Sequence, residues 1–563
     1  MARGTGTRMA GTIPAIAPRP RRACLRRPGA LSRRPVTDPS TPPREKTRVV
    51  VADGPATRLR RGHWLALAAV TALAAVVRAH GLGDWSLWID EAHTWRDATM
   101  PFDGEGGFAS TDRMLYPVAF LLLRALIDGG LLGEDELSLR LPFAVIGVLT
   151  VPALAIAGRR LVGATPAVLA ASLLAVHPWH VYWSQNARGY ALVVLAAVFV
   201  VERAFAFARH DRMRDFVLTW LGIAFATACH GTGALLAVGW AASVVLRRQS
   251  LTGSRIVVLA VAGLALAAVL PWAIDTFSPY TGFGRAKNAP SLTHFAQTVA
   301  YYFRPMALVL GAVGIALLHR VAGRERALLL GAFVAAPFAV LAVIGSASVL
   351  TTARYAIVAL PVLLWLVAFA CVRLGAPVRS GWTVRGVAPW LAAAALPLCL
   401  FGEQVIALRD YATIQHGQRA RWREAADFVR QRAAGRPLRA VTIHLPTLAY
   451  YLRRGLWRKK IAERDLRNEV LAITDWMVRE GRDQEKNLVT EPGPVGHLAW
   501  HRRAAAAAGA EFAMVFTLPE LAEQDRDGSL LAAIREQCEL ALHLPCWVGP
   551  KDESIYVYVW KRP

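Results

Sequence analysis

The sequence predicts a polytopic α-helical membrane protein with about 11 transmembrane helices and a C-terminal extracytoplasmic α/β domain. The 563-residue chain is 55% hydrophobic, above the roughly 45–50% of soluble domains. Its mean hydropathy is +0.34 although it contains 65 Lys and Arg and carries a net charge of +25. A soluble nucleic-acid-binding protein would explain the charge but not the hydrophobicity, and a disordered chain would explain neither. Six cysteines in this length exclude a disulfide scaffold.

Residues 1–62 form a basic arm. The arm holds fifteen Lys and Arg against Asp38, Glu45 and Asp53, is rich in Pro, and has no apolar periodicity. We therefore expect it to be disordered and cytoplasmic. The first apolar run, Trp64–Val77, begins too late for a signal peptide and is expected to be a membrane anchor.

Residues 63–406 form the predicted transmembrane domain, because apolar stretches that approach the length needed to span roughly 30 Å recur along them. The expected spans are 64–79, 141–158, 164–182, 189–207, 216–229, 231–246, 256–274, 305–318, 327–346, 354–372 and 387–406. Short arginine-containing loops fall at every second connection. The positive-inside rule then places these loops and the N-terminus in the cytoplasm.

Two stretches need separate interpretation. The apolar run 216–246 has arginines at both ends, so we expect a hairpin broken at residues 230–233. Tyr116–Leu132 is apolar but carries Arg124 and Asp128, and counting it as a full crossing would invert every later loop. We therefore expect a helix that lies at the outer membrane interface.

The loops that connect the spans on the side opposite to the arginine-containing loops are then extracytoplasmic. They include the acidic first outer loop, 80–140, which has eleven acids and four arginines. They also include the loops around 183–188, 230–233, 275–304 and 347–353, and the whole tail from residue 407 lies on the same side.

The tail, 407–563, has the pattern of a small α/β domain. Residues 421–432 are amphipathic, 439–444, 512–517 and 555–560 resemble strands, and 446–454 and 520–537 are helical in pattern. Cys538 and Cys546 either pair in this oxidising compartment or remain free thiols.

Adjacent carboxylates open the first outer loop. Asp90 and Glu91 follow an aromatic stretch at the end of a span, where charges cost free energy unless they are used. On a helix the two side chains cannot point the same way, so one acts while the other orients it or binds a cation. The alternative is a solvated loop with an acidic helix start.

Basic residues recur where spans begin on the same outer side. Arg188 lies in the segment Ser184–Tyr190, and Arg354 with Tyr355 opens the tenth span. Guanidinium groups suit a fixed phosphate because they donate two hydrogen bonds and stay charged. The alternatives are an arginine that snorkels to lipid headgroups and an Arg/Tyr interface anchor. His230 is a weaker candidate that is alternatively a buried, hydrogen-bonded histidine, and Lys287, in the loop 275–304, is alternatively a solvated side chain.

These segments resemble the GT-C fold polyprenyl-phosphate-sugar-dependent glycosyltransferases, in the branch of protein O-mannosyltransferases and aminoarabinose transferases (glycosyltransferase family 39-like). The resemblance covers about residues 64–460. It rests on the segments Leu87–Ala92, Leu132-Gly133 through Leu139–Pro142, Ser184–Tyr190, and Arg354-Tyr355 with Pro361.

The resemblance implies that Asp90 is the general base, with Glu91 beside it, in a cavity at the outer membrane face. It also implies interfacial helices in the first outer loop. Many relatives carry a Pro-Pro pair before the second such helix, whereas this chain reads Asp112-Arg113-Met114-Leu115-Tyr116-Pro117. Asp112 and His93 are further candidates for the site.

The expected reaction is inverting transfer of a hexosyl or pentosyl group from a polyprenyl phosphate to an acceptor hydroxyl on a glycan, lipid or protein. Asp90 would accept the proton, and Arg188, Arg354, Tyr190, His230 and Lys287 are the candidates for binding the donor phosphate. No metal-ligand spacing is evident, so dependence on a divalent cation is left open. We expect no nucleic-acid partner and a location in the bacterial cytoplasmic (inner) membrane.

Three other functions remain open. The same charges could form the headgroup path of a transporter or flippase of lipid-linked sugars, although no second copy of the Asp90-Glu91 or Arg188 pattern is present. A polymerase or ligase that uses diphosphate donors is the second alternative. The third is an inactive relative whose outer domain is a binding module.

Overall fold

The computed structural model describes residues 57–104, 107–247, 253, 256–257, 259–260, 264, 292–345, 353–380, 388–414, 417, 419–443, 445–452, 468–473, 488–491, 493–525, 527–548 and 551–561. The predicted disordered arm therefore lies almost wholly outside the described residues, as do most of the expected span 256–274 and Lys287. Everything below concerns the described part of the chain.

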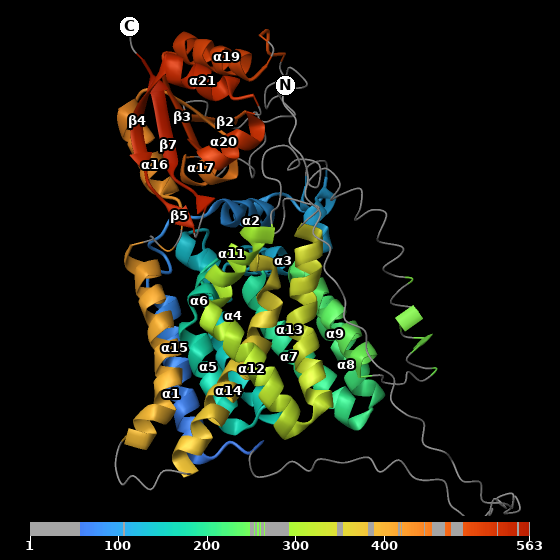
Figure 1. Cartoon of the computed structure of the whole chain (residues 1–563). Helices are drawn as coiled ribbons and strands as arrows, with labels where there is room; N and C mark the ends of the chain where they lie inside the picture. The colour runs from blue at the N-terminus through green and yellow to red at the C-terminus, as the bar shows by residue number, and fades with distance from the viewer. Residues whose placement is uncertain are drawn as a thin grey trace, which may run out of the picture. The chain divides into compact units, whose positions relative to one another are not determined.

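The first two thirds of the described chain are helical (Figure 1). The helices are α1 (Arg61–Ala79), α2 (Ile89–Thr99), α3 (Val118–Asp128), α4 (Glu136–Leu161), α5 (Ala164–Val176), α6 (Pro178–Ser184), α7 (Tyr190–His210), α8 (Met213–Cys229), α9 (Leu235–Leu246), α11 (Leu292–Phe303), α12 (Pro305–Ala322), α13 (Arg324–Gly345), α14 (Leu360–Ser380) and α15 (Ala388–Thr413). Short 3-10 turns, η2 (Phe108–Ser110), η3 (Asp112–Leu115), η4 (Gly231–Ala234) and η5 (Ala353–Ala359), connect some of them.

Six helical stretches of the described chain are long and apolar enough to cross a membrane. They are Arg61–Ala79, Glu136–Leu161, Tyr190–His210, Pro305–Ala322, Arg324–Ala342 and Ala353–Gly375. Two shorter apolar helices, Ala164–Val176 and Gly231–Leu246, accompany them. The described chain thus contains several helices that could cross a membrane by length and composition, but it does not confirm the expected number of eleven.

The expected span 164–182 is wrong as a single helix. Helix α5 ends at Val176, and α6 starts anew at Pro178 after His177 takes an extended conformation. Proline at the first helical position is favoured, but it cannot continue a preceding helix because it lacks the N–H group. Within the connection expected at 275–304, residues 292–303 form helix α11.

Two other interpretations agree with the structure. The run 216–246 is broken where expected: α8 ends at Cys229, η4 follows, and α9 begins at Leu235. Helix α3 has 11 residues and is about 16 Å long at 1.5 Å per residue, so it is too short to cross roughly 30 Å of hydrocarbon.

The core of the helical part lies around α7 and α14, whose apolar windows are 78% and 89% buried, whereas that of α1 is only 17% buried. Helix α4 approaches α14 closely at Gly158, where a Cβ atom would lie 2.1 Å from the indole nitrogen of Trp365. The same nitrogen donates to the Leu154 carbonyl oxygen at 3.0 Å. Only glycine allows this approach, which holds α4 against the most buried helix.

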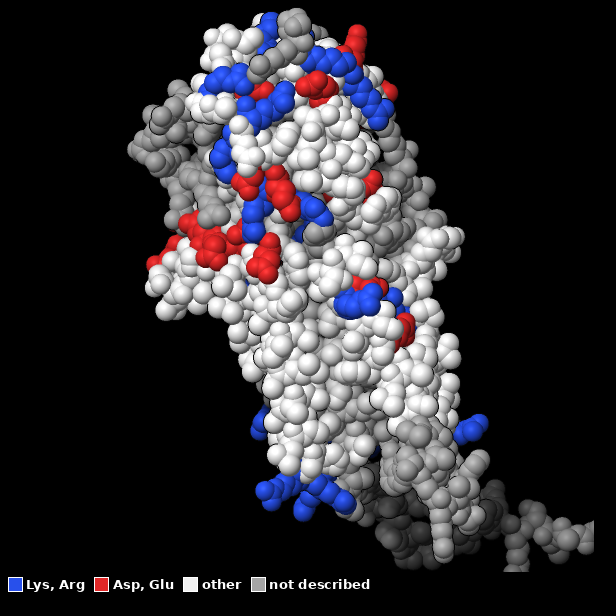
Figure 2. Space-filling model, turned by 90° about the vertical axis from the view of Figure 1, so that its left-hand side faces the viewer, with Lys and Arg blue, Asp and Glu red and all other residues white. Residues whose placement is uncertain are grey.

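Arginine-bearing connections meet at one end of these helices. The guanidinium of Arg326, at the start of α13, donates to the carbonyl oxygen of Leu161 at the end of α4, with an N–O distance of 3.1 Å. Figure 2 shows a belt of uncharged surface over the helices, with Lys and Arg gathered at its lower end. This separation of charged and uncharged surface is typical of a group of helices that crosses a membrane, with its two ends in water on either side.

The C-terminal part of the chain contains a five-stranded sheet with the strand order β2-β1-β3-β7-β4. Its strands are β1 (Leu438–Thr442), β2 (Asn468–Ala472), β3 (Glu511–Thr517), β4 (Cys538–Leu544) and β7 (Ile555–Trp560), with a separate pair of β5 (Trp547–Val548) and β6 (Lys551–Asp552). Strands β2, β1 and β3 are parallel, with Ala440 opposite both Val470 and Ala513, whereas β7 pairs antiparallel with β3 and β4. The helices are α16 (Trp422–Ala433), α17 (Leu445–Leu452), α19 (Gly493–Ala507), α20 (Leu518–Gln524) and α21 (Ser529–Gln537).

The sequence therefore predicts α16, α17, β1, β3 and β7 to within a few residues. It misses β2 and β4, and it merges α20 and α21 into one helix. Cys538 and Cys546 are both free thiols.

Candidate functional site

The Asp90-Glu91 pair forms the first turn of α2, where carboxylates are favoured by the partial positive charge of the helix N-terminus. Consecutive helical residues point about 100° apart, and the two side chains have different environments. Glu91 is fully buried, whereas 30% of the Asp90 side chain is exposed. The expectation that the two carboxylates differ in role is thus consistent with their geometry.

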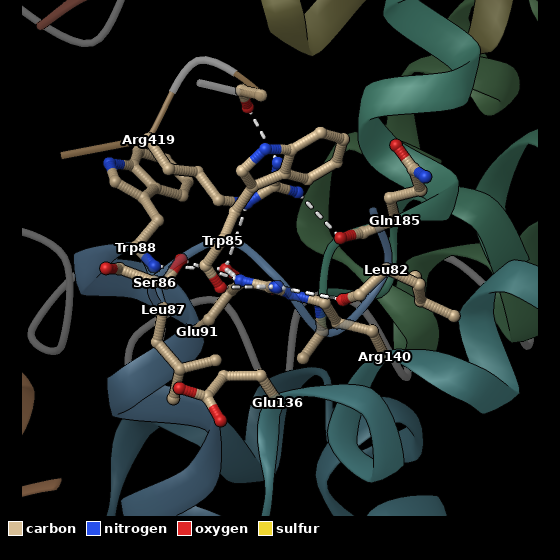
Figure 3. Close-up of polar contacts among 12 residues, drawn as sticks. Leu82, Trp85, Ser86, Leu87, Trp88, Glu91, Glu136, Arg140, Gln185 and Arg419 are labelled. Atoms are coloured by element: carbon tan, nitrogen blue, oxygen red, sulfur yellow. Dashed lines mark hydrogen bonds and ion pairs between the residues drawn. The ribbon is translucent and has the colours of Figure 1, made fainter. Parts of the chain in front are cut away.

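Two buried arginines from distant parts of the chain converge on Glu91 (Figure 3). The Arg140 guanidinium, on α4, donates to both carboxylate oxygens of Glu91, each at 2.8 Å. The Nε of Arg419 lies 3.3 Å from Glu91 Oε2. Neither arginine is more than 1% exposed. The negative charge of the Glu91 carboxylate is therefore compensated by two positive charges inside the protein.

Backbone groups complete the environment of this carboxylate. The amide N–H of Trp88 donates to Glu91 Oε2 at 3.0 Å, and that of Ala187 donates to Oε1 at 2.9 Å. Within the described residues, Glu91 thus accepts five hydrogen bonds. Burial alone would raise the pKa of Glu91, but the charges of Arg140 and Arg419 and these hydrogen bonds lower it to about 2.

Both arginines also bind the chain around Glu91. Arg140 donates to the carbonyl oxygens of Leu82, Trp85 and Ser86 at 2.8–3.0 Å. Arg419 donates to the carbonyl oxygen of Gln185 at 2.6 Å, so it links the segment after α15 to the segment before α7.

Further contacts hold the start of the first loop against the C-terminal part. Arg423, at the start of α16, pairs with Glu136 of α4 at 2.7 Å. The Leu87 amide donates to the Tyr451 hydroxyl oxygen at 2.6 Å. The start of α4 and the segment that leads into α2 are thereby held by residues of α16 and α17.

Asp90 faces Arg188, which lies just before α7. The Arg188 Nη2 atom is 3.9 Å from Asp90 Oδ2, and Nη1 donates to the Thr94 hydroxyl oxygen at 3.3 Å. The Arg188 side chain is 13% exposed. A partly accessible carboxylate and guanidinium thus lie side by side, next to the fully buried pair of Glu91 and Arg140.

A cluster of aromatic rings packs around His230, which lines the same crevice as Arg188. The ring of His230 lies 4.2 Å from that of Tyr190 and 5.9 Å from that of Tyr116, measured between centroids. The His230 and Tyr355 rings are stacked at 6.4 Å. His230 therefore joins the turn between α8 and η4 to α7, to η5 and to the chain before α3.

Arg354 lies at the same aromatic wall. Its Nη2 donates to the Tyr355 hydroxyl oxygen at 2.9 Å, and its guanidinium lies 5.9 Å from the centre of the Trp88 ring. Burial, followed by the charges of Arg188 and Arg354, lowers the pKa of His230 to about 3, and Asp90 opposes this shift. His230 is consequently a neutral imidazole at physiological pH.

A small pocket lies beside the Asp90–Arg188 pair. It is a narrow crevice without room for a water-sized molecule, and it is lined by Thr94, Tyr116, Ala119, Phe120, Arg188, Gly189, Cys229 and His230. Its polar lining comes from α2, the chain before α3, the chain before α7, and the turn after α8. The predicted residues Arg188 and His230 thus meet in one pocket.

The fold that holds this pocket matches known structures over most of its length. ArnT from Cupriavidus metallidurans in the apo state superposes with a TM-score of 0.54 at 16% identity, over 88% of this chain and 98% of that chain. ArnT from the same organism bound to undecaprenyl phosphate gives a TM-score of 0.56 at 15% identity, over 89% and 98%. The chain has the GT-C glycosyltransferase fold.

Two further comparisons bear on this GT-C chain. The archaeal oligosaccharyltransferase AglB from Archaeoglobus fulgidus, in complex with an inhibitory peptide and a dolichol-phosphate, matches with a TM-score of 0.50 at 12% identity, over 85% of this chain and 72% of that chain. The family model of dolichyl-phosphate-mannose-protein mannosyltransferases matches residues 117–274. No curated protein sequence matches significantly.

The remaining predicted residues lie at the edge of the candidate site or outside it. Asp112 forms an ion pair with Arg113, which also reaches Asp97 at 3.3 Å. His93 is half-buried on α2 and does not line the pocket. Lys287 lies outside the described residues.

Sequence reasoning missed three residues of the site. Arg140 belongs to one of the segments that carry the family resemblance, but the sequence assigns it no role. Tyr116 is likewise part of a segment in the first outer loop, and no pattern singles out its ring. Arg419 carried no sequence signal, because it is 328 positions from the glutamate it contacts. In the part of the chain that the structure describes, no three His, Cys, Asp or Glu side chains are grouped to hold a metal ion.

Proposed function

We propose that this chain transfers a sugar from a polyprenyl-phosphate donor to an acceptor hydroxyl at the outer face of the membrane, with inversion at the anomeric carbon. The observation that carries the proposal is the 3.9 Å approach of Arg188 to a partly exposed Asp90. An accessible base beside a fixed cation is what deprotonation of an acceptor next to a leaving phosphate requires. The GT-C fold, shared with an ArnT structure that holds undecaprenyl phosphate, supports this donor class.

Asp90 is the base in this mechanism. As the acceptor oxygen forms its bond to the anomeric carbon, the hydroxyl proton passes to the Asp90 carboxylate and the bond from that carbon to the phosphate oxygen breaks. The bonding electrons leave with the phosphate, whose charge grows in the transition state. General-base assistance of this kind is worth about 10²–10⁴-fold in rate.

Arg188 and Arg354 stabilise the negative charge that develops on the leaving phosphate. Guanidinium groups that are already held in place stabilise this charge without reorganisation when the bond breaks. Arg188 is held by Thr94 and Arg354 by Tyr355. Neutral His230, which lies close to both arginines, adds a polar surface but no third positive charge.

Glu91 positions the reacting groups rather than exchanging a proton. A carboxylate with a pKa of about 2 and five hydrogen bonds is a poor proton acceptor. Its contacts with the amides of Trp88 and Ala187 tie the residues next to Asp90 to the residue next to Arg188. The separation of base and cation is therefore set by Glu91.

We further propose the orientation that this chemistry requires. The N-terminus and the arginine-bearing end of α4 face the cytoplasm of a bacterial inner membrane, and residues 407–563 form an extracytoplasmic domain. The contact of Arg326 with the Leu161 carbonyl supports a common side for two of the basic connections.

The test is the reaction of purified protein in proteoliposomes with a radiolabelled polyprenyl-phosphate sugar. We expect free polyprenyl monophosphate to appear together with glycosylated acceptor. Asp90→Asn should abolish both products, whereas Asp103→Asn, which removes an exposed carboxylate of the same loop, should leave both unchanged.

Each other outcome contradicts the proposal in a recognisable way. Activity of the Asp90→Asn protein would show that Asp90 is not the general base. Movement of intact donor across the bilayer without release of monophosphate would indicate a flippase. Reaction only with a diphosphate-linked donor would indicate a polymerase or ligase.

A further inference from the structure

A second cavity lies away from the candidate site, on the surface formed by α4, α7 and α8. It is an apolar groove of about 760 Å³, within the range of ligand sites. Its walls include Ile156, Phe199, Leu221 and Phe225, whose exposed fractions are 41–59%. Gly222 lets α8 approach α7 here, because a Cβ atom would lie 2.8 Å from Val200.

One end of the groove is basic. Arg159, Arg160 and Arg203 line it together with a single acid, Glu202. Arg160 Nη1 contacts Glu202 Oε1 at 2.8 Å but the Arg160 side chain remains 46% exposed. Arg203 is held by Glu202 and by Asp215, the latter at 2.8 Å. The lining therefore keeps an excess of positive charge at one end only.

Within the described residues, Arg159 forms no ion pair, so the excess charge includes at least one guanidinium without an acidic partner. Arg159 and Arg160 lie at the end of α4 that is opposite to Arg140. The nineteen residues from Arg140 to Arg159 place these two ends about 28 Å apart along the helix at 1.5 Å per residue.

We propose that this groove binds an anionic phospholipid of the cytoplasmic leaflet. The phosphate contacts the guanidinium groups of Arg159 and Arg160, and an acyl chain lies between the apolar side chains of α4, α7 and α8. Basic recesses between membrane helices on the cytoplasmic side bind such headgroups, because a phosphate and a guanidinium attract each other strongly at the membrane surface.

The charge pattern separates this occupant from a polyprenyl phosphate bound at the candidate site. Arg188 lies just before α7 and Arg203 lies fifteen residues further along the chain, which is about 22 Å along the helix axis. A lipid whose phosphate binds Arg188 would bring only an uncharged tail to the basic end of the groove. An anionic phospholipid instead matches the groove with its charge at the basic end and its chain toward the membrane centre.

The test is retention of lipid by the purified full-length protein. The protein is exchanged from detergent into nanodiscs that contain phosphatidylcholine with a tenth of phosphatidylglycerol, then released and weighed by native mass spectrometry. We expect one retained phosphatidylglycerol and a preference of about tenfold over phosphatidylcholine, the size of one charge-assisted contact.

Matched variants assign the lipid to the groove. Arg159→Gln with Arg160→Gln should reduce retention about tenfold, and Ala153→Phe should reduce it by filling the apolar wall while keeping both arginines. Arg320→Gln with Arg324→Gln, which removes the same charge from exposed residues of the α12–α13 connection outside the groove, should change nothing.

Retention of the two phospholipids in their bulk proportion by the wild-type protein would overturn the proposal, as would unchanged retention in both groove variants. Retention of polyprenyl phosphate in place of phosphatidylglycerol, lost on Ala153→Phe, would assign the groove to the donor tail instead. All variants are compared as monodisperse protein by size-exclusion chromatography, so that loss of folding is recognised before lipid is measured.

Discussion

Replacement of Glu91 by Gln isolates the buried charge that organises the site. The substitution keeps the shape of the side chain but removes the negative charge that faces Arg140 and Arg419. It also presents amide N–H groups to a position where five N–H donors converge within the described residues. The glutamine amide therefore cannot satisfy every donor that the Glu91 carboxylate satisfies.

The expected cost follows from the pKa of Glu91. A shift from 4.5 to about 2 corresponds to about 3 kcal/mol at 1.36 kcal/mol per unit. Removal of one partner from a buried ion pair typically costs about 3–5 kcal/mol, because the remaining charge stays buried without compensation. The two figures agree, so we expect Glu91→Gln to lower the free energy of unfolding by about 3 kcal/mol.

The assay is thermal unfolding of purified protein across a pH series. Because folding lowers the pKa of Glu91, its stabilisation is present above pH 4.5 and is lost as the pH falls toward 2. The wild-type Tm should exceed that of Glu91→Gln by several degrees at pH 7, and the difference should shrink below pH 4.5. Asp90→Asn is the control and should unfold like the wild type.

The reasoning would be refuted if Glu91→Gln matched the wild-type Tm at pH 7, or if the two proteins differed by the same amount at pH 7 and at pH 3. It would also be refuted if Asp90→Asn were as unstable as Glu91→Gln, because the partly exposed carboxylate would then carry structural charge.

Three further outcomes are expected. Arg188→Gln should lower the transfer rate about 10–100-fold with little change in Tm, since it removes a charge-assisted contact to the leaving phosphate; an equal fall in Tm would make the residue structural. Arg419→Lys keeps the charge but cannot bridge Glu91 and Gln185 as the guanidinium does, so kcat should fall and the Tm should drop, and the wild-type rate in this variant would contradict the bridge. His230→Gln should keep the shape of the activity–pH profile between pH 5 and 8, because the pKa of His230 is about 3; loss of an acidic limb near pH 6.5 would show that the imidazole titrates in the working range.

Local sequence patterns predicted the elements that depend on local chemistry. The amphipathic period of 421–432 corresponds to α16, and the apolar runs 512–517 and 555–560 correspond to β3 and β7. The break at 230–233 was visible because Gly and Thr interrupt an apolar run. The break before Pro178 also has a local signal, the proline itself, but the apolar residues on both sides favoured one continuous span.

The missed strands show the limit of such patterns. Strand β2 (Asn468–Ala472) is short and begins with two polar residues, and its place at the sheet edge depends on pairing with β1. Strand β4 (Cys538–Leu544) directly follows α21, and its side chains are largely exposed on one face. Neither segment has a local pattern that distinguishes it from the end of a helix or a loop.

The sequence by itself determined that the chain crosses a membrane, that its basic connections alternate, and that Asp90, Glu91 and Arg188 are the candidates for chemistry. Only the tertiary structure decided which carboxylate is accessible. Glu91 is buried because Arg140 and Arg419, 49 and 328 positions away, neutralise it, and Asp90 stays beside Arg188 because the next position on the helix points elsewhere. Membrane insertion depends on local hydrophobicity, which a sequence displays directly, whereas the environment of a carboxylate depends on charges that only folding brings together.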